Sequence, residues 1–216
     1  MRIEASVNAG ASIVLPLVPS PSHPPMEPSP PTDPAAVAAL MAGCPVPWCI
    51  AGGWALDLFL GRRTRPHADV DVATFRADQA ALRAHLPGWS FRKAVGGALV
   101  EWPEGERLEL PVHEIHALSP SGEPLEFLLN ERNGDEWVFR RDARIRCRAD
   151  RVIVRDAGTI PYLCPAVALL YKSKAPRPAD EQDFEAVRAE LPADQREWLR
   201  AALATVHPDH PWIRRL

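Results

Sequence analysis

The stretch Ile50-Ala-Gly-Gly-Trp-Ala-Leu-Asp-Leu-Phe-Leu-Gly-Arg-Arg-Thr-Arg-Pro-His-Ala-Asp-Val-Asp-Val72 decides the fold of this 216-residue chain. Residues 46–51 are an apolar run that ends at Gly52-Gly53, the pattern of a short buried strand followed by a tight turn. Residues 54–60 predict a helix that stops at Gly61. Residues 69–75 alternate polar and apolar side chains, which is typical of a half-buried strand. We therefore expect strand, glycine turn, helix and strand in succession.

Asp69 and Asp71 are the first candidates for chemistry in this stretch. At positions i and i+2 of a strand, both carboxylates leave the same face. Two carboxylates so close repel each other unless a cation lies between them, and Mg²⁺ prefers such oxygen ligands. The amides at Gly52 and Gly53 open a helix, where phosphates are favoured. From spacing alone, a tight turn beside a solvent-facing acidic strand explains the pattern equally well.

The same 23 residues closely resemble the start of the aminoglycoside 2″-nucleotidyltransferases and lincosamide nucleotidyltransferases, which belong to the DNA polymerase β-like superfamily. The match includes Gly-Gly-Trp-Ala, Leu-Gly-Arg, Thr-Arg-x-His and Asp-x-Asp. The resemblance implies Mg²⁺-dependent transfer of a nucleoside monophosphate, usually AMP from ATP, to a substrate hydroxyl. It assigns Asp69 and Asp71 to metal binding and catalysis, and Gly52 and Gly53 to nucleotide binding.

The family generally adds a third carboxylate from a neighbouring strand, as metal ligand or general base. Glu126, in Pro124-Leu-Glu-Phe-Leu-Leu129, alternates with apolar neighbours and is our first choice. Glu109 and Glu114 are the alternatives. A glutamate reaches one methylene further than the aspartate that many relatives use.

Two basic residues are candidates for binding the triphosphate of ATP. Lys172, in Leu169-Leu-Tyr-Lys172, matches a lysine that the superfamily brings from this helix; the alternative is a solvated lysine at a helix end. Asp180 and Asp183 resemble an acidic block that follows in relatives, but early-helix acids also stabilise the helix dipole, which is the interpretation we favour.

Arg65 is the second basic candidate, in the connection that also holds Arg62, Arg63 and His67. Arginines here either bind phosphate or fix the metal strand by pairing with Asp57. For His67 we favour orientation of Asp69 over metal ligation.

The fold expected is α+β: a polymerase β-like core with a mixed sheet and flanking helices over residues 33–158, then a C-terminal helical region over 159–216. Helices are predicted over 35–41, 76–86, 166–174, 179–191 and 192–206. Short strands over 91–95, 98–102, 108–118, 125–129 and 137–140 form antiparallel hairpins. Nine of the 24 prolines fall within the first 34 positions, so residues 1–32 are expected to be a disordered, Pro-rich tail.

Composition narrows the partners. The net charge of −3 gives no general attraction to nucleic acid, and no apolar run approaches a membrane span. Without a secretory signal, and with four cysteines in no metal-binding spacing, a cytoplasmic monomer or homodimer is expected.

The predicted function is adenylyl transfer to a small hydroxylated molecule, for which an aminoglycoside-like polycation is the leading candidate. Glutamates of the hairpin region would supply an acidic acceptor cleft: Glu101, Glu104, Glu106, Glu109, Glu114 and Glu123. Two alternatives stay open: an antitoxin-type or protein-modifying nucleotidyltransferase, and a catalytically inactive nucleotide-binding homologue.

Overall fold

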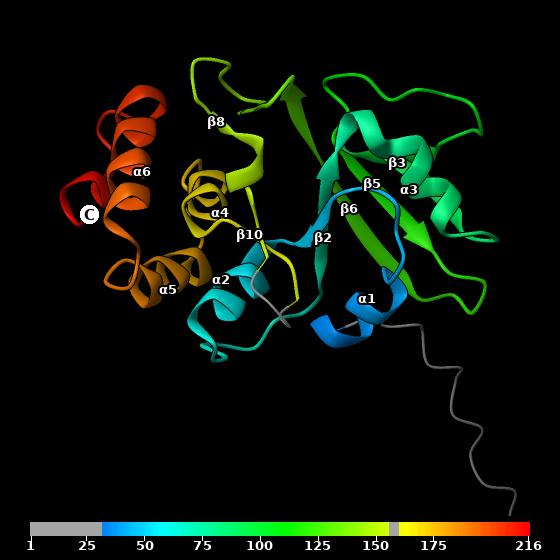
Figure 1. Ribbon diagram of the computed structural model, residues 1–216, viewed down its shortest axis with the longest axis horizontal. Coiled ribbons are helices and arrows are strands. Elements are labelled where there is room, and N and C mark those ends of the chain that lie inside the picture. Colours follow the sequence, from blue (N-terminus) through cyan, green and yellow to red (C-terminus); the bar gives the residue numbers. More distant parts are fainter. Residues whose placement is uncertain (1–31, 156–159) are drawn as a thin grey trace, which may run out of the picture.

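A computed structural model describes residues 32–155 and 160–216 of the chain. Residues 1–31 lie outside the described ranges. The predicted disorder of residues 1–32 therefore stays a prediction. The described chain forms a ten-stranded mixed sheet with the strand order β4-β3-β5-β6-β2-β1-β10-β9, and β7 and β8 continue from β6 (Figure 1). This α+β architecture, with helices at one end, confirms the predicted fold class.

The deciding stretch folds as β1 (Trp48–Ile50), α2 (Gly52–Leu60) and β2 (Asp71–Phe75), after α1 (Pro34–Leu40). Gly61 ends α2 in the left-handed conformation, with φ of +63°. β1 pairs antiparallel with β2 in the sheet. One expectation was wrong: the strand begins at Asp71, so Asp69 lies in the connection before it.

The middle of the chain is built from hairpins, as predicted. Its elements are η1 (Arg76–Asp78), α3 (Gln79–His85), β3 (Ser90–Val95), β4 (Ala98–Glu101), β5 (Glu114–Leu118), β6 (Pro124–Asn133), β7 (Glu136–Val138) and β8 (Arg146–Arg148). The strand predicted over 108–118 was wrong in its first half. Pro111 has no N–H for a ladder, and the amide of Leu108 donates instead to Gln79 Oε1 at 2.6 Å.

The pairing that builds the site is not a hairpin. β2 runs parallel to β6, and Asp71 lies opposite Glu126 in this register. β6 also pairs antiparallel with β5, where His116 lies opposite Glu126. β2 and the β5–β6 hairpin, which are distant in sequence, therefore place their polar residues side by side.

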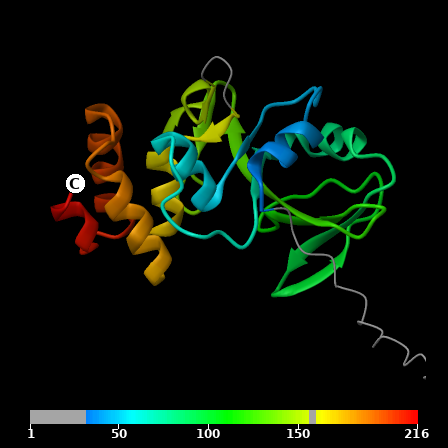
Figure 2. The same ribbon diagram turned by 90° about the horizontal axis from the view of Figure 1, so that it is seen from below.

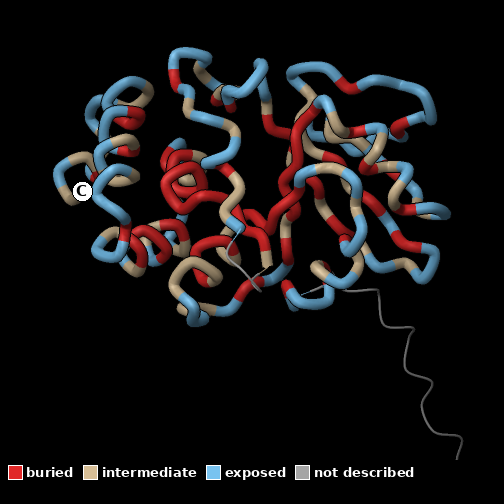
Figure 3. The backbone as a smooth tube through the Cα atoms, in the orientation of Figure 1, coloured by how far each residue is buried: buried red, intermediate tan, exposed pale blue. Residues whose placement is uncertain are grey.

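The C-terminal part begins with η2 (Ala149–Arg151), β9 (Ile153–Val154) and β10 (Tyr162–Leu163), which complete the sheet beside β1. Then come α4 (Pro165–Lys172), α5 (Pro178–Val187), α6 (Ala193–Val206) and η3 (Pro211–Arg214). α4 is almost wholly buried between the sheet and α6 (Figure 3). The C-terminal helices gather at one end of the molecule and the β3–β4 hairpin lies at the other (Figure 2). None of the helices in the described ranges is long and apolar enough to cross a bilayer.

Candidate active site

Carboxylates from three segments converge at the start of β2. Asp71 on β2 and Glu126 on β6 are register partners, and both side chains are half-buried. Asp69, exposed just before the strand, is close enough for its charge to act on both. The structure therefore brings together the three acids that the sequence proposed, although Asp69 reaches the site from a loop.

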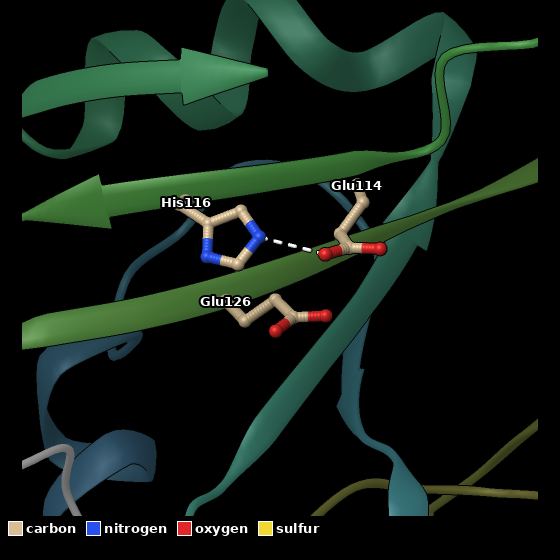
Figure 4. A group of neighbouring side chains, drawn as sticks. All are labelled: Glu114, His116 and Glu126. Atoms are coloured by element: carbon tan, nitrogen blue, oxygen red, sulfur yellow. Dashed lines mark hydrogen bonds and ion pairs between the residues drawn. The ribbon is translucent and has the colours of Figure 1, made fainter. Parts of the chain in front are cut away.

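Glu114 and His116 extend this group on β5. The side chains of Glu114, His116 and Glu126 point toward one another from adjacent strands (Figure 4). Potential ligand atoms of these three lie within 4.8 Å of one another, and His116 Nε2 is 2.7 Å from Glu114 Oε1. Glu114, one of the alternatives for the third acid, is thus a neighbour of Glu126, whereas exposed Glu109 pairs with Arg107.

Burial and mutual repulsion both disfavour the charged forms of these acids. Burial, followed by the charges of Asp71, Glu114 and Asp69, raises the pKa of Glu126 to about 8. Burial and the charge of Asp69 raise the pKa of Asp71 to about 6. A divalent cation removes this repulsion, and hard carboxylate oxygens are the ligands that Mg²⁺ accepts. The donor set therefore fits the predicted metal.

Gly52 places the beginning of α2 directly against Asp71. The amide of Ala51 donates to the carbonyl of Asp71 at 2.8 Å, which ties the end of β1 to the start of β2. Gly52 has φ of +61°, and a Cβ there would lie 2.5 Å from Asp71 Oδ2. Only glycine leaves space between the helix N-terminus and the carboxylate, where the resemblance places a phosphate.

Gly53 has a different role in the geometry. A Cβ at Gly53 would lie 2.3 Å from a terminal nitrogen of Arg65 and 2.6 Å from Cε1 of His67. The absent side chain thus makes room for two residues of the connection that leads to Asp69. The predicted role of Gly53 in nucleotide binding stays a prediction.

His67 is part of a buried network that fixes this connection. Its Nε2 lies 2.5 Å from Asp57 Oδ2, and Asp57 Oδ1 accepts from the Thr64 hydroxyl at 2.6 Å. Trp54 packs on His67 with ring centroids 4.5 Å apart. His67 therefore holds the loop before Asp69, in line with the orienting role we favoured.

Arg65 and Lys172 meet on two buried aspartates of α5. Arg65 donates two hydrogen bonds to Asp183, at 2.7 and 2.8 Å, rather than pairing with Asp57. Lys172 Nζ lies 2.7 Å from Asp180 Oδ1 and 3.0 Å from Asp183 Oδ2. Burial acts to raise the pKa of Asp183, but the hydrogen bond from Arg65 and the charge of Lys172 hold it below its ordinary value. These acids therefore do more than stabilise a helix dipole.

A cleft of about 520 Å³ opens beside this network. Gly52 and Lys172 line it, and Arg65 does not. Arg140 and Arg141 also line this cleft, although sequence reasoning did not single them out. The available signal was a run of arginines over residues 140–151 in which this adjacent pair stands first.

Of the glutamates expected to form an acidic acceptor cleft, Glu114 lies at the site. Glu101 lies on β4 at the edge of the sheet, and Glu106 pairs with Lys93. The acidic surface is therefore built mainly from β2, β5 and β6 rather than from the hairpin loops.

A mixed sheet that carries paired carboxylates beside a glycine-opened helix is the arrangement expected of a nucleotidyltransferase. Comparison with known proteins supports the same class. A family model described as aminoglycoside-2″-adenylyltransferase matches residues 35–148, more than half of the chain. The protein therefore belongs to this family. No curated protein sequence matches it.

Solved structures share the fold at low sequence identity. The lincosamide antibiotic adenylyltransferase LnuA, in a lincomycin-bound crystal structure, is 14% identical with a TM-score of 0.51, covering 76% of this chain and 99% of that one. ANT(2″)-Ia with adenylyl-2″-tobramycin is 18% identical with a TM-score of 0.51, covering 79% and 94%. A solution structure of ANT(2″)-Ia is 21% identical with a TM-score of 0.50, covering 81% and 90%.

Proposed function

We propose that this protein transfers AMP from ATP to a hydroxyl group of a small molecule, with Mg²⁺ as cofactor. The observation that carries the proposal is the register of Asp71 opposite Glu126 on parallel strands, with Gly52 against the same carboxylate. This arrangement offers cation ligands and phosphate-binding amides at one point of the fold.

Each residue has a distinct role in the proposed reaction. Asp69 and Asp71 would hold Mg²⁺, which would neutralise phosphate charge and lower the pKa of the acceptor hydroxyl. Glu126 accepts the proton of that hydroxyl, whose oxygen forms a bond to the α-phosphorus. The bond from the α-phosphorus to the bridging oxygen breaks, and pyrophosphate leaves with the electron pair. Gly52 and Lys172 bind the triphosphate.

The acceptor is proposed to be cationic, as an aminoglycoside is. Glu114 adds a fourth carboxylate to the acids of the site, and it lies beside Glu126, where the acceptor hydroxyl must approach. Such a concentration of negative charge favours a polyamine over a neutral molecule. We also propose a cytoplasmic location, because the proposed reaction uses ATP and Mg²⁺.

Mass spectrometry tests the function directly. The full chain is incubated with ATP, MgCl₂ and a panel of aminoglycosides, lincosamides and neutral sugars. An AMP adduct on an aminoglycoside supports the proposal, including its acceptor class. An adduct found only on a lincosamide or neutral sugar contradicts the cationic acceptor; an adduct found only on protein contradicts a small-molecule acceptor. No adduct on any component contradicts the transfer itself.

A further inference from the structure

The cleft beside Lys172 has an unusual charge for this molecule. Five basic side chains line it: Arg140, Arg141, Lys172, Lys174 and Arg177. Among the described residues, the acids in this lining are Glu114 and Asp180. The whole chain carries a net charge of −3, so the cleft concentrates positive charge in an acidic protein. Such a local field attracts a polyanion.

Arg140 and Arg141 differ from the arginines that follow them. Arg144 and Arg148 each pair with an aspartate two residues away, Asp142 and Asp150. Within the described residues, neither Arg140 nor Arg141 forms an ion pair with a carboxylate, although both line the cleft. Two adjacent cations that lack a directly paired carboxylate repel each other, and a bound anion offsets that repulsion.

The pair is held in place by Tyr171 on α4. Arg141 donates to the Tyr171 carbonyl at 2.9 Å, and the two guanidinium carbons lie 5.6 and 5.4 Å from the centroid of its ring. The Tyr171 hydroxyl in turn donates to Asn130 at 3.0 Å. Burial lowers the pKa of Arg141, and the neighbouring charge of Arg140 lowers it further. The arginines are therefore oriented before any ligand arrives.

We propose that Arg140 and Arg141 bind the β- and γ-phosphates of the nucleoside triphosphate and hold the pyrophosphate as it leaves. This assignment rests on the proposed function, since it needs a triphosphate in the cleft. Gly52 and Lys172 line the same cleft as the arginine pair, so a triphosphate bound there is within the reach of both groups of residues. Planar guanidinium groups suit this role because they form two parallel hydrogen bonds with phosphate oxygens.

The ion pairs of Lys172 explain why further cationic side chains are needed in the cleft. Lys172 is engaged by Asp180 and Asp183, so part of its charge is already neutralised. When the bond to the α-phosphorus breaks, the leaving pyrophosphate gains negative charge. Arginines without a carboxylate partner are free to stabilise that charge.

Titration calorimetry with inorganic tripolyphosphate tests the proposal without any acceptor or reaction. Arg140→Ala and Arg141→Ala are each expected to weaken binding at least tenfold, about 1.4 kcal/mol. Arg144→Ala, on the same loop and with the same loss of charge, is the matched control and should bind like the wild type. Arg140→Lys should fall between wild type and Arg140→Ala. Thermal melts verify that each variant is folded.

Adenosine alone is the second probe, and Arg140→Ala should leave its binding unchanged. Tripolyphosphate binding that is unaffected in both alanine variants overturns the proposal. So does an equal loss in Arg144→Ala, which indicates only a general charge effect, or a loss confined to adenosine, which assigns the pair to the base. If tripolyphosphate binds through the pair but no AMP transfer occurs with any acceptor, the proposed function fails while the anion site stands.

Discussion

Replacing Gly52 with alanine separates backbone strain from damage to the site. Gly52 has φ of +61° and a Cβ would lie 2.5 Å from Asp71 Oδ2. Gly61 has φ of +63° and a Cβ there meets nothing within 4 Å. The two glycines flank the same helix and share the left-handed conformation, so Gly61→Ala is a matched control.

Both variants should lose similar stability. An alanine in the left-handed region costs about 1–2 kcal/mol, which urea denaturation measures as the free energy of unfolding. The new Cβ in Gly52→Ala contacts the end of the Asp71 side chain. The carboxylate can therefore rotate away from it, and the protein stays folded. A displacement of about 1 Å at a reacting group lowers the rate by about a hundredfold.

The assay is AMP transfer from ATP, followed by mass spectrometry, on an acceptor found in the panel. We expect Gly61→Ala to retain wild-type activity and Gly52→Ala to lose about a hundredfold. Equal activity in the two variants would refute the claim that the space at Gly52 serves the Asp71 carboxylate. A much larger loss of stability in Gly52→Ala would show that the carboxylate cannot rotate as described.

Two further predictions concern charge. The folded-state pKa of Glu126 is raised from 4.5 to about 8, so the protein is most stable below pH 4.5 with respect to this group and loses that stability as pH rises to 8. In EDTA, Glu126→Gln should therefore match wild type near pH 4 and exceed it by about 2 kcal/mol at pH 9, after allowing for solvent screening. Equal stability at pH 9 contradicts the raised pKa. Arg65→Ala leaves buried Asp183 with Lys172 alone and should lower the free energy of unfolding by about 3 kcal/mol in urea denaturation; a loss below about 1 kcal/mol shows that Lys172 suffices.

The part of the fold that could be predicted best from the sequence is the region around the glycine turn. Strand, turn, helix and strand follow from apolar runs and glycine positions, and each formed close to where it was expected. The start of β2 was misjudged because alternation of polar and apolar residues continues through Asp69 although pairing with β1 begins later. Alternation describes side-chain faces and contains no information about where a neighbouring strand begins.

Contacts between segments distant along the chain could not be predicted from local sequence patterns. The parallel pairing of β2 with β6 fixes Glu126 next to Asp71, and local spacing cannot show a register between residues 55 positions apart. For Arg65 the sequence left two partners open, a phosphate of ATP or the nearby Asp57, but the structure pairs it with Asp183 on α5. The Arg140–Arg141 pair was missed because its distinguishing feature is the lack of a paired carboxylate among the described residues. That feature can be recognised only when the positions of all neighbouring side chains are known.

The most direct measurement compares AMP transfer by the wild type and Asp71→Asn, with and without EDTA. Asparagine keeps the size of the side chain and removes its charge, and circular dichroism confirms the fold. If Asp71 holds a catalytic Mg²⁺, transfer should fall at least about a hundredfold in the variant, and EDTA should abolish it in the wild type. Wild-type rates in Asp71→Asn, or full activity in EDTA, would contradict the account.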